Sequence, residues 1–289
     1  MASQPETGSS RHLATVLALV AGYVDTLGFV ALFGLFTAHV TGNFVLIGKE
    51  LAGPGPGDGV LLKLLAFPAF ICAVALSQVV ARSAQQHGHS AVRRLFVLQI
   101  VLLGGFMVAG LATGLPHDAV VRAGGTASHA WPVLAAGVLG AMSMGVQNAQ
   151  GRLELATLVP TTVMTGNVTQ LVIDLVDLLL AGQARRAGQG GQAGSIAGNG
   201  SANIANSTSS TPASNTDNNT ASKPPDHPDA TALLAARSRI ARMLPPMLGF
   251  TLGAIGGAFA YVATSFWALL LPLALLLWAA LISGEKHVR

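Results

Sequence analysis

The chain has 289 residues, the length of about two soluble domains, yet 51% of them are hydrophobic and only 10% are charged. A soluble domain carries roughly 25% charged residues. The mean hydropathy is +0.57, and the stretches 95–115, 131–149 and 243–284 contain no Asp, Glu, Lys or Arg. This composition excludes an ordinary cytosolic enzyme and predicts an all-α protein that crosses a membrane several times.

The net charge of +4 does not indicate a nucleic-acid partner, because the basic residues stand at the ends of apolar runs, where they orient a membrane protein. The single cysteine, Cys72, excludes an intrachain disulfide and a metal site of paired thiolates. We therefore expect the lipid bilayer as a partner, and no nucleic acid, metal or cofactor. Residues 1–12 form an N-terminal tail, and the apolar stretch after them is too long for a cleaved signal peptide.

Five apolar runs are each long enough to cross the hydrocarbon core, which takes about 20 residues. These runs are 60–81, 95–115, 131–149, 243–263 and 265–283. Little more than Thr264 and Ser265 separates the last two, so we expect a tight helical hairpin. The first apolar run, 13–51, is too long for one span, and its second part, 37–51, begins with polar residues and ends with charged ones.

Residues 153–181 show the same mixed pattern, because Pro160 interrupts the run and Asp174 and Asp177 close it. Proline disfavours the helical conformation in the residue before it, so we expect a break there and a new helix after it. The two aspartates lie three residues apart on one helical face. We interpret them, and Glu50 at the corresponding place in the first half, as solvated helix ends rather than as a metal pair.

Residues 183–230 contain almost no large apolar side chain. Such a segment cannot bury enough surface to offset the entropy lost on ordering. We therefore expect a disordered loop that interrupts the second half of the protein, and a short C-terminal tail at 284–289.

An internal repeat relates the two halves, since the triplet Thr41-Gly42-Asn43 recurs as Thr165-Gly166-Asn167. In the same register Glu50 aligns with Asp174, and with a one-residue gap Asp25 aligns with Asn148. Each half is thus expected to contain a spanning helix, a Thr-Gly-Asn segment and two further spanning helices.

The distribution of basic residues predicts the topology of these repeats. If both Thr-Gly-Asn segments are broken or re-entrant and do not cross, six spans remain, and 13 of the 16 Lys and Arg lie on the side of the N-terminus. If both segments cross fully, there are eight spans, and 12 of the 16 Lys and Arg lie on the side of the N-terminus. Only the six-span arrangement places the cluster of Arg82, Arg93 and Arg94 in the cytoplasm. Three spans in each half make residues 13–115 and 131–283 an inverted repeat, an arrangement typical of transporters and channels, with both termini cytoplasmic.

Four segments carry a resemblance to a known family: GYVDTLGF (22–29), TAHVTGNFVLIG (37–48), GVQNA (145–149) and TTVMTGNVTQL (161–171). Together they resemble the YoaK-like family, a group of six-helix bacterial membrane proteins of unknown function. The resemblance covers about 13–283 except the loop 183–230. It implies a bacterial inner-membrane location and six helices, and it supplies no substrate or catalytic residue.

Asp25 is the one acid in the middle of a predicted span. An ionisable group in that position costs at least about 2.5 kcal/mol and usually faces the interior of the helix bundle or water. One interpretation is a proton or cation site. The other is a hydrogen-bonded strut that joins Asp25 to Gln147 or Asn148 and so holds the two repeats together.

The Thr-Gly-Asn triplets are the second candidate, because they offer amides, hydroxyls and close backbone approach. They could line a constriction from both sides, or merely permit close helix packing. His39, next to the first triplet, is interpreted as a packing residue. The small residues Gly249, Gly253, Gly256 and Gly257, and likewise Gly137 and Gly140, are expected to form packing seams.

The motifs of common enzymes are missing from the sequence, including metalloprotease, nucleophile-elbow and phosphate-loop patterns. We therefore expect a transporter or channel for a small solute or ion, with a non-transporting scaffold or sensor as the alternative and an intramembrane enzyme as the weakest one. A homo-oligomer is compatible with each. The residues expected to line the path are Asp25, Thr41, Gly42, Asn43, Gln147, Asn148, Thr165, Gly166 and Asn167.

Overall fold

The computed structural model describes residues 8–53, 59–114, 130–155, 164–195 and 230–284. Within these ranges the chain is divided into two units, residues 1–168 with 242–289 and residues 169–241, and each is described by itself. Every regular element in the described part is a helix, which confirms the all-α prediction. The helices are α1 (Gly8–Ala31), α2 (Gly42–Leu51), α3 (Val60–Gln86), α4 (Ala91–Ala112), α6 (Trp131–Leu153), α7 (Met164–Ser195), α8 (Ala230–Thr264), the 3₁₀ helix η2 (Ser265–Leu269) and α9 (Leu270–Gly284).

Four stretches of the described residues are long and apolar enough to cross a membrane, namely His12–Ala31, Val60–Gln86, Ala91–Ala112 and Leu233–Ser283. The last is 51 residues long and contains the predicted hairpin, since the chain turns at Ser265, whose φ is +55°. By contrast, α2 has 10 residues and is about 15 Å long, which is too short to cross. The chain is therefore a membrane protein by the length and apolarity of its helices.

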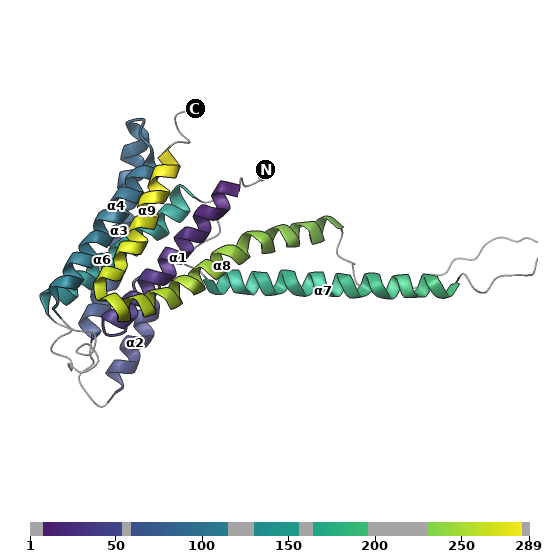
Figure 1. Cartoon of the computed structure of the whole chain (residues 1–289), viewed down its shortest axis with the longest axis horizontal. Helices are drawn as coiled ribbons and strands as arrows, with labels where there is room; N and C mark the ends of the chain where they lie inside the picture. Colours follow the sequence, from purple (N-terminus) through teal and green to yellow (C-terminus); the bar gives the residue numbers. More distant parts are fainter. Residues whose placement is uncertain (1–7, 54–58, 115–129, 156–163, 196–229, 285–289) are drawn as a thin grey trace, which may run out of the picture. The chain divides into compact units, whose positions relative to one another are not determined.

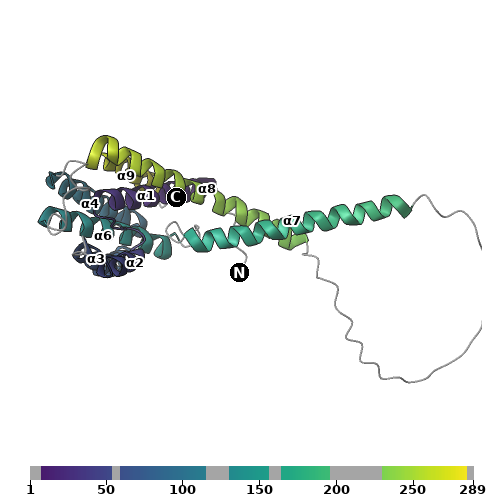
Figure 2. The ribbon, with the colours of Figure 1, turned by 90° about the horizontal axis from the view of Figure 1, so that it is seen from below.

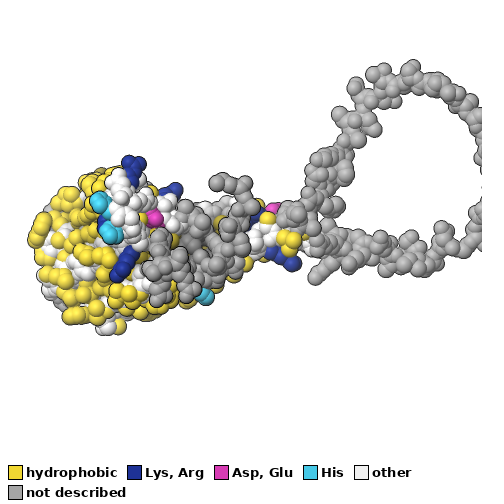
Figure 3. All heavy atoms as spheres, turned by 90° about the horizontal axis from the view of Figure 1, so that it is seen from above, with side chains coloured by type: hydrophobic (Ala, Val, Ile, Leu, Met, Phe, Trp, Pro, Cys, Tyr) yellow, Lys and Arg dark blue, Asp and Glu magenta, His cyan; other side chains and the backbone are white. Residues whose placement is uncertain are grey.

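The first unit is built from α1, α3, α4, α6 and α9, which run alongside one another in both ribbon views (Figures 1 and 2). Its core is apolar and closely packed, and the largest fully buried side chains include Leu27, Leu35, Phe96, Phe106, Met144 and Leu269. Apolar side chains also cover most of its outer surface in the view of Figure 3. An apolar exterior of this kind suits a protein surrounded by lipid.

Helices α1 and α8 pack with their backbones in close contact. A Cβ atom added to Gly249 would meet the carbonyl oxygen of Thr15, and the same holds for Gly253 with Leu19 and Gly257 with Tyr23. The contacts advance by four residues on both helices, so the helices run in the same direction. The predicted packing seam of small residues in α8 is confirmed, although Gly256 itself has only ordinary contact with the Tyr23 ring.

A second close contact joins α3 and α6, and these helices are also parallel. Gly137 lies against the Leu62 side chain, and Gly145 lies against the backbone of Phe70. Gly140, the other glycine of the predicted seam, packs against Thr37 and the Phe106 ring. Small residues therefore set the helix distances in both halves of the chain.

The structure corrects the expected start of the disordered loop. Helix α7 continues to Ser195, so the first part of the segment 183–230 is helical rather than disordered. Residues 196–229 lie outside the described residues, as do Pro160 and the break expected there. Composition alone gave the wrong boundary because glycine and glutamine lower helix propensity without preventing a helix from extending.

Candidate functional site

The first span ends in a sharp change of backbone direction that we call the break, residues 32–41. Phe33 and Gly34 have φ values of +52° and +74°, and a left-handed backbone at a phenylalanine is strained. The chain then runs without regular structure until α2 begins at Gly42. The first Thr-Gly-Asn segment is therefore broken, as predicted, and the short helix α2 follows the break.

Asp25, in the last two turns of α1, reaches into the break, and it is buried with 4% of the residue exposed. Its Oδ1 atom accepts hydrogen bonds from the backbone N–H of Ala38 at 2.6 Å and of His39 at 3.4 Å. The hydroxyl of Thr37 donates to the same oxygen at 3.4 Å. Asp25 is thus a hydrogen-bonded strut. The expected partners were Gln147 or Asn148, but the carboxylate instead bonds to residues of the break.

His39 completes the surroundings of this carboxylate. Its Nδ1 atom lies 2.7 Å from Oδ2 of Asp25, while 37% of its side chain is exposed. The ring also packs edge-on against Phe250, 5.6 Å between centroids. The interpretation of His39 as a packing residue was therefore incomplete, because it also connects a buried acid with the surface.

Asn43 holds the other side of the break. Its Oδ1 accepts from the backbone N–H of Phe36 at 2.9 Å, and its Nδ2 donates to the carbonyl oxygen of Phe36 at 2.8 Å. The residue is 1% exposed, so the amide is used by the backbone and does not face an open path. In the same triplet Thr41 is exposed and Gly42 packs against the Phe36 ring.

We predict that Asn43→Ala destabilises the protein by about 1–3 kcal/mol, because both backbone groups of Phe36 lose their partner in a buried place. Thr41→Ala, an exposed position in the same triplet, is the control and should change stability by less than about 0.5 kcal/mol. Thermal unfolding of the purified variants in detergent measures both. Equal stability of Asn43→Ala and wild type would contradict the assigned role.

Lys63, in the first turn of α3, also contacts the break. It is 1% exposed, and its Nζ donates to the carbonyl oxygen of Phe33 at 2.6 Å and to Oε1 of Glu50 at 2.7 Å. A buried ammonium is tolerated only when it is paired and hydrogen-bonded. The interpretation of Glu50 as a solvated helix end was wrong, because Glu50 is the partner that a buried lysine requires.

The second unit contains a similar ion pair. Asp174 of α7 is fully buried, and Arg239 of α8 donates to it from Nη2 at 2.7 Å and from Nε at 3.0 Å. Gln170, one turn earlier, donates to Oδ1 at 3.0 Å. The interpretation of Asp174 as a solvated helix end was therefore also wrong, whereas Asp177 is exposed as expected.

Gln147 belongs to a separate polar contact inside the first unit. Its Nε2 donates to the carbonyl oxygen of Leu17 at 2.8 Å, and its Oε1 accepts from Nε2 of Gln99 at 2.7 Å. Ser143, one turn earlier on α6, donates to the carbonyl oxygen of Gln99 at 3.3 Å. The hydrogen bonds of Gln147 therefore connect α1, α4 and α6.

The remaining predicted residues are less closely associated. Asn148 is half-buried and Asn167 is buried, and both have interaction partners in the structure. Gly166 is exposed, and the side chain of Thr165 lies outside the described residues. Asp25 and Asn43 lie together around the break. The structure adds His39, which was interpreted only as a packing residue, and Lys63, which the sequence interpretation missed.

Among the described residues no group of three His, Cys, Asp or Glu side chains could hold a metal ion. In the break, a buried carboxylate is hydrogen-bonded to a partly exposed imidazole.

Comparisons with known proteins agree with this membrane fold. The chain is similar to the UPF0700 transmembrane protein YoaK of Bacillus subtilis (strain 168), with 30% identity over 164 residues. The aligned part covers 56% of this chain and 66% of the relative, just under two thirds of its length. No solved structure matches the chain. The family model described as "Protein of unknown function (DUF1275)" matches residues 13–282, so the chain belongs to this family of membrane proteins.

Proposed function

We propose that this protein is a transporter or channel for a small solute or ion, rather than an enzyme, and that it resides in the bacterial inner membrane. The observation that carries the proposal is the contact between Asp25 and His39, with 2.7 Å between the carboxylate and the imidazole. The acid is buried and the imidazole is partly exposed. A solute or ion that reaches His39 therefore contacts a side chain bonded to the carboxylate that holds the break.

The packing of two equivalent glycines supports a repeat of the kind found in transporters. Gly22 of α1 lies against the backbone oxygen of Phe250, and Gly145 of α6 lies against the backbone oxygen of Phe70. The two glycines begin the aligned segments that contain Asp25 and Asn148. In each case the first helix of one half packs on a helix of the other half, as two intertwined halves require.

The ion pairs support the same repeat. Glu50 and Asp174 each follow the asparagine of their triplet by the same spacing, and each pairs with a base on the next helix, Lys63 and Arg239 respectively. With six spans, α1 and α8 both run from the cytoplasm outwards, in keeping with their parallel packing. We propose this six-span inverted repeat with cytoplasmic termini, which would place polar groups at the interface of its halves.

A second candidate function, a non-transporting scaffold or sensor, is favoured by a different observation. The polar atoms of Asn43 and one carboxylate oxygen of Asp25 are used by backbone groups of the break. Residues of this kind can serve only to maintain the shape of the chain. The two candidates differ in whether water reaches His39 when the protein is in a bilayer.

We predict that a thiol at position 39 reacts with a charged, water-soluble thiol reagent in liposomes. The variant is His39→Cys in a Cys72→Ala background, because Cys72 is itself exposed. Val101→Cys in the same background is the control, since Val101 is exposed on α4 within an apolar stretch and should face lipid. Labelling at 39 but not at 101 supports a route for water, and inert thiols at both positions from both sides contradict transport.

A separate experiment tests ligand binding by measuring the thermal stability of the purified protein in detergent. A solute that binds only the folded state stabilises it by about 2.7 kcal/mol at a hundredfold excess over its dissociation constant. We expect such a shift for at least one metabolite or ion, and we expect Asp25→Asn to abolish it. A shift that survives Asp25→Asn would place the binding site elsewhere.

A further inference from the structure

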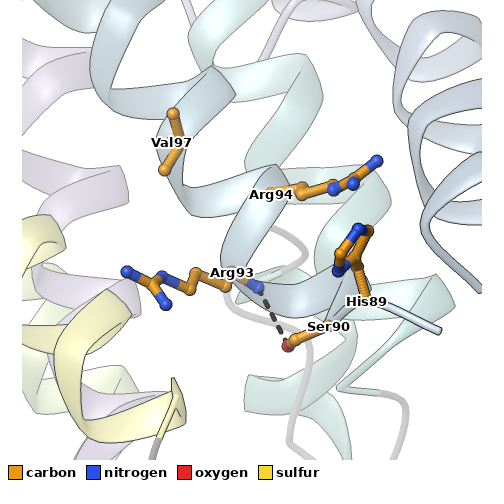
Figure 4. A pocket seen from close by; sticks show the side chains of 5 residues that line it. All are labelled: His89, Ser90, Arg93, Arg94 and Val97. Carbon is orange, nitrogen blue, oxygen red and sulfur yellow. Dashed lines mark hydrogen bonds between the residues drawn. The ribbon is translucent and has the colours of Figure 1, made fainter. Parts of the chain in front are cut away.

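The turn between α3 and α4 contains a pocket that the proposed function does not use. The cavity has a volume of about 370 Å³ and is lined by His89, Ser90, Arg93, Arg94 and Val97 (Figure 4). Three of the five lining side chains are basic. Basic side chains also gather on one part of the apolar unit in the space-filling view (Figure 3).

The backbone around this pocket is well fixed. Gly88 adopts a φ of +67°, and the N–H of His89 donates to the carbonyl oxygen of Ala84 at 2.9 Å, which closes the end of α3. Ser90 then caps α4, its hydroxyl accepting from the N–H of Arg93 at 3.4 Å. The basic side chains therefore project from a defined turn, with Arg93 and Arg94 extending to opposite sides of it (Figure 4).

No acid neutralises these arginines within the described part of the chain. The ion pairs found there involve His39, Lys63 and Arg239. Glu154, at the end of α6, accepts a hydrogen bond from Gln85 at 3.1 Å instead. The pocket therefore has an excess of positive charge and suits an anion.

The surroundings of the pocket indicate the rest of the ligand. Both α3 and α4 are candidate spans, so the turn between them lies at a membrane surface. Exposed apolar side chains continue from the pocket along one face of α4, at Val97, Val101 and Val108. The spacing from Arg93 keeps these positions on one side of the helix. A molecule with an anionic head and an apolar tail matches both features.

We propose that this pocket binds the phosphate of an anionic phospholipid, whose acyl chain lies along the valine face of α4. Basic pockets at the ends of spans are a common way to recognise such headgroups. Arg93 and Arg94 supply the charge, and His89 and Ser90 supply further hydrogen-bond donors. The ligand comes from the membrane itself, so binding does not depend on what the protein transports.

The test uses the full chain in a non-ionic detergent, to which phosphatidylglycerol, phosphatidylcholine or inorganic phosphate is added. We expect phosphatidylglycerol alone to raise the melting temperature in a saturable way. Arg93→Gln with Arg94→Gln should weaken its apparent affinity by about fivefold for each arginine removed. Arg82→Gln is the matched control, because Arg82 is exposed on α3 at the same end of the unit and does not line the pocket.

Several results would overturn the proposal. These are stabilisation by inorganic phosphate equal to that by phosphatidylglycerol, equal stabilisation by phosphatidylcholine, or a loss of affinity in Arg82→Gln as large as in the double variant. Arg93→Lys with Arg94→Lys, which keeps the charge, should retain binding and guards against a folding defect in the glutamine variant. Native mass spectrometry of the wild type in an equimolar mixture of the two lipids gives an independent result, and equal retention of both contradicts the proposal.

Discussion

Lys63→Met should destabilise the protein by about 3–5 kcal/mol, which is the largest effect of a single side chain that we predict. The substitution keeps the volume of the lysine stem but removes the ammonium that Glu50 and the carbonyl oxygen of Phe33 share. Glu50 then holds a partly buried charge without a partner, and the strained turn at Phe33 loses its support. Loss of helix during titration with a denaturing detergent, followed by circular dichroism, measures the change.

Two further variants distinguish the contribution of the ion pair to stability from other effects of replacing lysine by methionine. Lys49→Met alters an exposed lysine next to Glu50 in the sequence and should change stability by less than about 0.5 kcal/mol. The double variant Lys63→Met with Glu50→Gln should recover part of the loss, because the unpaired charge is gone. A Lys63→Met protein as stable as Lys49→Met would show that the buried pair contributes little.

The helical architecture of this protein could be predicted from its sequence, because the length of the apolar runs and the polar residues between them largely determine where a chain crosses a membrane. The absence of charge over 243–284 indicated the long C-terminal apolar stretch, and Thr264 and Ser265 marked its turn. Asp25 was recognised for a physical reason, since a lone acid within a span is costly and must have a use. The polar start and charged end of 37–51 also indicated the break at the first Thr-Gly-Asn triplet, although they did not predict the short helix α2.

The partners of the polar residues could not be read in the same way. Glu50 and Lys63 lie on separate helices, and helical periodicity does not reveal which charges meet once the chain folds back. Asp174 and Arg239 are separated further, by a segment of low complexity. One signal was available: an acid at the same distance after each triplet, with a base in the helix that follows.

His39 was undervalued for a related reason. It has Val163 opposite it in the repeat, so the comparison of the two halves gave it no weight. The structure shows that the relevant feature is the break itself, where strain at Phe33 turns the chain back and brings His39 to Asp25. Backbone strain of this kind is set by tertiary contacts and leaves no pattern in the sequence.

The close glycine contacts give a prediction that bears on the repeat as well as on stability. Gly22→Ala should cost about 3 kcal/mol, because the added methyl group meets the backbone of Phe250 and lies 3.1 Å from the amide nitrogen of Ala254. Gly145→Ala should cost about 1–3 kcal/mol, since its methyl group would lie 2.9 Å from the carbonyl oxygen of Phe70. Denaturing-detergent titrations of the two variants measure both costs.

Gly104→Ala is the matched control, because Gly104 lies within α4 and nothing approaches its added Cβ within 4 Å. It should leave the protein as stable as the wild type or stabilise it by up to about 1 kcal/mol, since alanine is the better helix former. Helix α1 packs on α8 at Gly22, and α6 packs on α3 at Gly145, so under the proposed repeat the two costs report on equivalent contacts. If only one glycine proves sensitive, the two contacts are not equivalent, and the case for an inverted repeat must rest on the ion pairs alone.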